Sequence, residues 1–213
     1  YMETKDHKAV GIFLIEHIAE KVEKPLQWAL LWGCVEPDFN VLTYLKGSMH
    51  GEKLRGHNYE NAYERISCFV HKLERTQKKM RDTFGMYGMF LKLKWHFLLG
   101  KLTHYVADAF TFPHNKIYPG GFKDHCSYEE KLKRDLRSYI KSGEAEKQYV
   151  SGGHFVDAKA LCDYIQKAHD DYIARKHDVA DDITHIVEVN HRAIEGMIEV
   201  LARKSENHRL KHS

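Results

Sequence analysis

The fold is decided in residues 100–108, which read Gly-Lys-Leu-Thr-His-Tyr-Val-Ala-Asp. His104 and Asp108 are four positions apart in this stretch, and on an α-helix that spacing places both side chains on one face. The residues around them are mostly apolar, so we expect a largely buried helix over about 87–110 that stops before Pro113. An imidazole and a carboxylate in such surroundings need a partner, which is either a metal ion or each other.

Helical patterns continue on both sides of this segment. Apolar residues at spacings of three and four indicate a first helix, and they are Val10, Phe13, Leu14, Ile18 and Val22. A short helix over 26–32 is expected to end at Gly33, with a loop as far as Gly56. Further helices are predicted over 59–80, 124–141, 156–176 and 179–204. The sequence therefore predicts an all-α fold, a single multi-helix bundle in one domain over 1–213 with a helical C-terminal part over 154–204.

The composition is that of a globular protein, with 43% hydrophobic and 30% charged residues in a chain of 213. The formal net charge of +3 is too small to indicate a nucleic-acid-binding surface by itself, and no apolar run is long enough to span a membrane. The four cysteines contain no Cys-x-x-Cys pair, which excludes a zinc finger or a thioredoxin motif. No signal peptide is recognised, so we expect a cytoplasmic protein, and the oligomeric state stays open.

Histidine is the unusual entry in the composition, with 16 residues in 213. A second pair, His125 and Glu129, repeats the four-residue spacing within the helix predicted over 124–141. His114 stands between the two pairs, directly after Pro113. Two such pairs on facing helices, with a histidine between them, can direct ligands toward metal ions that lie near one another.

Three positions nearer the N-terminus complete the candidate set. Asp38 ends the pattern Gly33-x-x-x-Pro-Asp and is expected in a loop, and His7 is expected in the first turn of the first helix. The third position is a loop histidine, for which His57 is preferred over His50 because a position just before a helix holds a ligand more rigidly. Each of these residues alone is more often a turn or surface residue, and only their combination carries weight.

In this order the motifs resemble those of the zinc-dependent phospholipase C family, whose all-α superfamily also includes trinuclear-zinc single-strand nucleases. The resemblance covers about 7–129 and is most specific over 104–114 and 125–129. It implies two or three zinc ions (Zn²⁺) in one cleft. Carried over by position, the first ion is held by Asp38, the loop histidine, His104 and Asp108, the second by His114, His125 and Glu129, and the third by His7 with Asp108 bridging.

The resemblance further implies a metal-dependent hydrolase of phosphoester bonds, in which Asp38 is the catalytic residue that positions or deprotonates the attacking water. A phospholipid head group and a small phosphodiester both fit as substrates, a peripheral membrane contact fits the first of them, and a nucleic acid stays open. The alternatives are a nuclease-like phosphodiesterase of the same superfamily and a non-catalytic, metal-stabilised binding domain.

The other histidine motifs are interpreted as parts of the fold and not as ligands of a functional site. His169-Asp170 and His177-Asp178 are expected on a solvated helix face. The basic stretch over 131–137 could meet a phosphate or an anionic lipid surface, but is interpreted as a solubilising face. A di-iron bundle needs two Glu-x-x-His pairs, whereas this chain contains one, Glu188-x-x-His191, so a di-iron site is not expected.

Overall fold

The structure is a computed structural model, which describes residues 4–39, 59–147 and 155–209. Within those residues the regular structure is helical throughout, so the all-α fold predicted from the sequence is confirmed. The α-helices are α1 (Thr4–Ile18), α2 (Lys24–Phe39), α4 (Tyr59–Arg81), α5 (Gly85–Ala109), α6 (Phe122–Lys141), α7 (Glu144–Lys147), α8 (Ala158–Ile173) and α9 (Val179–Arg209), with 3-10 turns η1 (Ala19–Lys21) and η3 (Phe112–His114).

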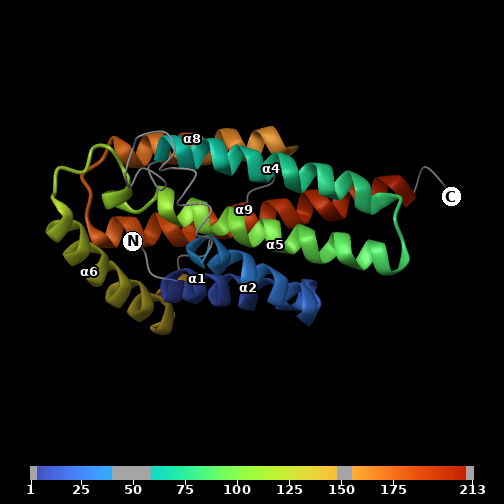
Figure 1. The fold of residues 1–213 in the computed structure, drawn as a ribbon, viewed down its shortest axis with the longest axis horizontal. Coiled ribbons are helices and arrows are strands. Elements are labelled where there is room, and N and C mark those ends of the chain that lie inside the picture. The colour runs from blue at the N-terminus through green and yellow to red at the C-terminus, as the bar shows by residue number, and fades with distance from the viewer. Residues whose placement is uncertain (1–3, 40–58, 148–154, 210–213) are drawn as a thin grey trace.

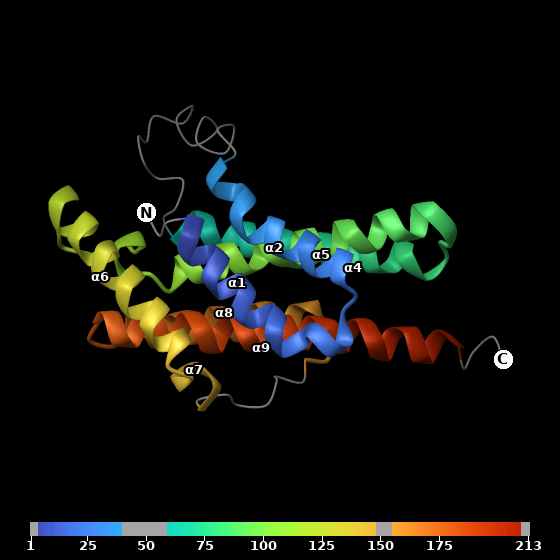
Figure 2. The same cartoon turned by 90° about the horizontal axis from the view of Figure 1, so that it is seen from below.

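Helix α5 is the central element, because it packs against α2, α4 and α9. Figures 1 and 2 show α4, α5 and α9 along the long axis of the molecule and α6 across the end at which α5 terminates. The apolar positions predicted to face inward on this helix are buried, namely Trp95, Leu98, Leu99, Leu102 and Val106. A helix that is apolar on nearly all sides forms the core of such a bundle, and its last three turns carry His104 and Asp108 into that core.

Helix α2 is longer than the sequence predicts, because it continues through Gly33 and ends at Phe39. Gly33 is a packing residue, and a Cβ added to it or to Gly100 of α5 would overlap a backbone carbonyl of the other helix. The two glycines therefore let α2 and α5 approach closely. Pro37 is tolerated because it stands in the last turn of α2 and removes one hydrogen bond there. Asp38 consequently lies on the end of a helix, and its prediction as a loop residue is wrong.

The remaining helices begin and end within a few residues of their predicted bounds. At the start of α6, the Asp124 carboxylate accepts a hydrogen bond from the Gly121 N–H at 2.9 Å. The α8 start is capped in the reverse sense, since the N-cap residue Asp157 accepts from the Ala160 N–H at 2.8 Å. None of the described helices is both long and apolar enough to cross a membrane.

Candidate metal centre

The side chains singled out in the sequence meet where several helix ends converge. Helix α1 begins there with His7, α2 ends there with Asp38, and α5 brings His104 in its last turns. The 3-10 turn η3 contributes His114, and the first turns of α6 contribute His125 and Glu129. Most of these side chains are buried, so the packing of the helix ends holds them in place.

The first group consists of His7, Asp38 and His104. One ligand atom from each residue lies within 4.8 Å of the others, a separation that one metal ion can bridge. The rings of His7 and His104 are stacked with their centroids 3.7 Å apart, and both side chains are almost completely buried. The structure thus places His7 beside Asp38 and His104.

Backbone contact determines which nitrogen of His104 faces this group. His104 Nδ1 lies 3.0 Å from the Cys34 carbonyl oxygen, and because a carbonyl only accepts, Nδ1 carries the proton and donates it. The other nitrogen, Nε2, therefore faces Asp108 Oδ2 at 3.3 Å and Asp38 Oδ1 at 3.8 Å. Either a proton on Nε2 or a metal ion can balance these carboxylates, and metal-binding histidines are typically held through the other ring nitrogen in this way.

The second group consists of His114, His125 and Glu129, whose ligand atoms also lie within 4.8 Å of one another. His114 Nε2 is 3.1 Å and His125 Nε2 is 3.0 Å from the same atom, Glu129 Oε1. The four-residue spacing of His125 and Glu129 on α6 produces one of these contacts, whereas the contact with His114 depends on how η3 packs on α6.

Asp108 lies between the two groups. Its Oδ1 is 3.5 Å from His7 Nε2 and 3.3 Å from His114 Nδ1, and its Oδ2 is 3.3 Å from His104 Nε2. A carboxylate with this placement is suited to bridge two ions. The resemblance also implies a bridging role for Asp108, but between the ion held by His104 and the ion held by His7.

The electrostatics of the centre are those of histidines and carboxylates removed from water. Burial by itself lowers the pKa of His114, but Asp108 and Glu129 raise that pKa to about 9. His7 behaves differently, since burial and the neighbouring His104 lower its pKa. Against the effect of burial, His104 and His114 hold the pKa of Asp108 well below its usual value. Protons and a divalent cation therefore compete for the same nitrogen atoms.

The donor atoms of the set fit zinc, which takes imidazole nitrogen and carboxylate oxygen. Within the described residues, Nδ1 of His7 and Oδ2 of Asp38 are buried without a hydrogen-bond partner. Buried polar atoms are nearly always satisfied in proteins, so a ligand is indicated at these positions. The loop histidine stays a prediction, because His57 and His50 both lie outside the described residues.

Two residues that the sequence did not single out hold α1 in position at the centre. Arg137 of α6 donates from Nη2 at 2.7 Å and from Nε at 3.0 Å to Asp6 Oδ1, next to His7. Arg137 is therefore a partner of Asp6, in contrast to the solubilising role expected for 131–137. The two residues are far apart in sequence, and no local pattern connects them.

The prediction that His169 lies on a solvated helix face is wrong. It is 3% exposed, and its Nε2 donates to Asn115 Oδ1 at 2.9 Å. Asn115 Nδ2 in turn donates to the carbonyl oxygens of Ala109 and Thr111. Helix α8 packs this side chain against the turn after α5, so His169 supports the segment that carries His114.

Asp182 of α9 holds the same segment from another direction. Its carboxylate accepts hydrogen bonds from the Phe112 N–H at 2.9 Å, the Tyr128 hydroxyl at 3.0 Å and the Tyr172 hydroxyl at 2.7 Å. These bonds tie α9 to η3 and to α6 immediately before Glu129. The sequence does contain a signal for this residue, because an acidic side chain three positions after Val179 falls on the apolar stripe of α9.

We expect the free energy of unfolding of Asp182→Asn to depend less on pH than that of the wild type. Burial raises the pKa of Asp182 to about 7 although Phe112 and the two tyrosines donate to it, whereas a free aspartate titrates at 3.8. The folded chain holds this proton more tightly, so the stability it contributes is complete below about pH 4 and is lost as the pH rises through about 7. Urea unfolding at about pH 5 and about pH 8 measures the difference. Asp170→Asn, at an exposed position of α8, is the control, and equal pH slopes for wild type and Asp182→Asn would refute the expectation.

The chain is similar to known proteins at the level of a family. A family model described as zinc dependent phospholipase C matches residues 10–179. Searches of the curated proteins and of the solved structures find no match. The matched region contains Asp38, both His–carboxylate pairs and His114, and begins three residues after His7. Because the match covers most of the chain, the protein belongs to the zinc-dependent phospholipase C family.

Proposed function

We propose that the protein is a zinc-dependent hydrolase of phosphodiester bonds, with a phospholipid as the substrate class that its family suggests. The observation that supports this most is the position of Asp108 within 3.5 Å of histidines from both ligand groups. Two adjacent groups joined by one carboxylate suit the hydrolysis of phosphate esters, in which both the attacking and the leaving oxygen need stabilisation.

The residues of the centre would hold two or three zinc ions. The first would lie among His7, Asp38 and His104, and the second among His114, His125 and Glu129, with Asp108 shared. A loop histidine, His57 or His50, would complete the first group or help to form a third site. Zinc bound here supplies a Lewis acid for the phosphoryl oxygen and makes water a stronger nucleophile near neutral pH.

Asp38 is the residue that we assign to the attacking water. Its side chain is 12% exposed, whereas those of His7 and His104 are almost completely buried, so Asp38 is the most exposed member of the first group. Its Oδ1 faces His104, and its Oδ2 has no hydrogen-bond partner among the described residues. Although that oxygen is itself buried, it could accept a proton from a water bound within the centre while the ring of His104, held by the Cys34 carbonyl, stays in place.

Zinc content is the first measurement that tests this function. Protein purified without a chelator is expected to contain two or three zinc ions per chain by elemental analysis. Anomalous scattering at the zinc edge would then identify the ligands and decide between His57 and His50. Protein without zinc would contradict the proposal.

The second test is turnover of a small phosphodiester with added zinc. Asp38→Asn is expected to lower kcat by about 100-fold, the lower end of what proton transfer to a positioned side chain contributes. The zinc content of this variant is to be measured in parallel, and Asp170→Asn is the control of equal charge change. Zinc binding without turnover that depends on Asp38 would favour the non-catalytic, metal-stabilised binding domain. Short-chain phospholipid and single-stranded DNA, assayed side by side, separate the lipase from the nuclease.

A further inference from the structure

The turn between α4 and α5 exposes a group of large apolar side chains at the end of the molecule opposite α6 (Figures 1 and 2). Phe84 is 87% exposed and Met86 is 91% exposed, and Tyr87, Met89 and Phe90 are exposed as well. Gly85 adopts a φ of 66° there, a left-handed conformation that favours glycine. Single exposed apolar residues are common, but a cluster on one protruding turn indicates a surface that contacts another apolar phase.

The charge of the protein is concentrated around this turn. Residues 72–94 contain seven Lys or Arg and two Asp or Glu, an excess of five positive charges. That excess is larger than the net charge of +3 of the whole chain, so the rest of the chain is slightly acidic. In the part of the chain that the structure describes, Lys72, Arg75, Lys79 and Lys94 take part in no ion pair, whereas Lys78 lies 4.0 Å from Glu74. The modest overall charge therefore hides a strongly basic end.

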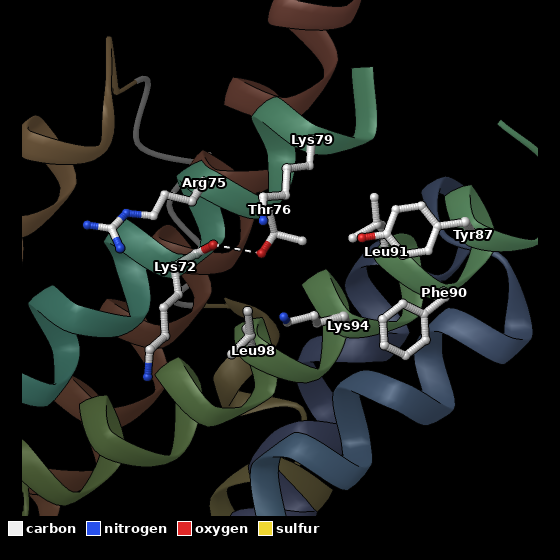
Figure 3. A pocket seen from close by; sticks show the side chains of 9 residues that line it. All are labelled: Lys72, Arg75, Thr76, Lys79, Tyr87, Phe90, Leu91, Lys94 and Leu98. Carbon is white, nitrogen blue, oxygen red and sulfur yellow. Dashed lines mark hydrogen bonds between the residues drawn. The ribbon is translucent and has the colours of Figure 1, made fainter. Parts of the chain in front are cut away.

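These four cations line a groove between α4 and α5 directly behind the apolar turn. Its volume is about 400 Å³. Figure 3 shows Lys94 reaching from α5 toward α4, with Lys72 and Arg75 on the far side and the rings of Tyr87 and Phe90 on the side of the turn. The groove thus offers positive charge and aromatic surface within one hollow, next to Phe84 and Met86.

We propose that the α4–α5 turn docks onto a lipid surface that carries anionic head groups. Phe84 and Met86 would enter the boundary between head groups and acyl chains, while the cations of the groove contact lipid phosphates. Charge complementarity selects this occupant, because cations without an ion pair that lie behind a protruding apolar tip match a surface that is anionic outside and apolar beneath. A protein partner would have to present an acidic rim around an apolar pocket, and it is an outcome of the test.

This contact is separate from the candidate metal centre and does not depend on the proposed hydrolysis. Gly85 and His104 are 19 positions apart on α5, which at about 1.5 Å per residue separates the turn from the centre by about 28 Å. Docking through the turn would keep the protein at the lipid surface without placing a metal ligand there. Variants of the turn should accordingly leave zinc content and turnover of a small phosphodiester unchanged.

Co-sedimentation of the full chain with vesicles tests the proposal. The wild type is expected to bind vesicles of phosphatidylcholine with phosphatidylserine, to bind phosphatidylcholine alone more weakly, and to lose binding as salt is raised. Lys79→Gln with Lys94→Gln should lower partitioning by about 25-fold, since each cation near such a surface contributes about fivefold. Phe84→Ser with Met86→Ser should lower it by about tenfold or more.

The matched control is Lys159→Gln with Lys167→Gln, which removes the same charge from α8, where both lysines are exposed. This double variant should bind the anionic vesicles within about twofold of the wild type, because long-range effects of net charge are screened. Unchanged thermal unfolding of each variant shows that it is folded. Two outcomes overturn the proposal: the wild type does not bind anionic vesicles, or the control variant loses as much vesicle binding as Lys79→Gln with Lys94→Gln. The first outcome includes the case in which the wild type binds poly-glutamate, a stand-in for an acidic protein partner, instead of the vesicles.

Discussion

Asp108→Asn is expected to abolish most of the hydrolysis, with a decrease of about 10³-fold or more. The side chain touches histidines of both ligand groups, so this variant weakens two metal positions at once. The amide keeps the size of the side chain but loses its charge, and its nitrogen cannot bind a cation. Metal ions stabilise the transition state of such reactions by several kcal/mol, and the loss of that stabilisation corresponds to the expected decrease in rate.

Zinc measurements separate this outcome from a general loss of structure. Added zinc should raise the Tm of the wild type, because a ligand that binds only the folded state stabilises it. The rise should be smaller for Asp108→Asn, and its zinc content should fall, whereas Asp170→Asn should match the wild type in both. A variant that keeps full zinc content and turnover would show that Asp108 is not a shared ligand, and the proposed function would lose its main support.

Gly100→Ala is expected to have the largest effect on stability, with a loss of about 4 kcal/mol in the free energy of unfolding. The new Cβ would overlap the Leu30 carbonyl oxygen and crowd the backbone at Gly33, and backbone atoms cannot move aside as a flexible side chain can. Overpacking of a core usually costs about 1–3 kcal/mol, and a clash with the backbone of a neighbouring helix lies at or above the upper end. Gly33→Ala should behave alike, because its Cβ would overlap the Phe97 carbonyl.

The same variants should weaken zinc binding, because the contact of α2 with α5 sets the position of Asp38 relative to His104. These two residues are 3.8 Å apart at their nearest ligand atoms. Gly121→Ala is the control, since its Cβ would meet only an ordinary contact at 3.6 Å from Asp124 Oδ2. Urea unfolding measures the free energy of unfolding of the three variants. A loss below about 1 kcal/mol for Gly100→Ala would contradict the prediction, because it would show that α2 and α5 can move apart with little loss of stability.

The elements that could be predicted from the sequence are those governed by local periodicity. The spacing of apolar residues predicted the helices and the inward face of α5, and the structure confirms both. The pairs His104–Asp108 and His125–Glu129 were visible for the same reason, because the helix repeat places residues four apart on one face. The order of these motifs also indicated the family, which the match over residues 10–179 shows.

Gly33 shows where local reasoning failed. A glycine after an apolar segment usually marks a helix end, and here it marks the closest approach of two helices instead. The difference depends on Gly100, which is far away in the sequence, so nothing near Gly33 could reveal it. As a result the position of Asp38 on a helix became clear only from the structure.

The contacts that hold the segments of the metal centre in place likewise depend on tertiary structure. Arg137 binds Asp6, His169 holds Asn115, and Asp182 accepts from Phe112, and each pair joins helices or turns that are distant in sequence. By itself, the sequence determined the all-α fold and the residue types of a metal centre, because helix periodicity acts over a few residues. Only the packing of helix ends decided that one carboxylate, Asp108, lies between two groups of ligands, since that requires five segments to meet in space.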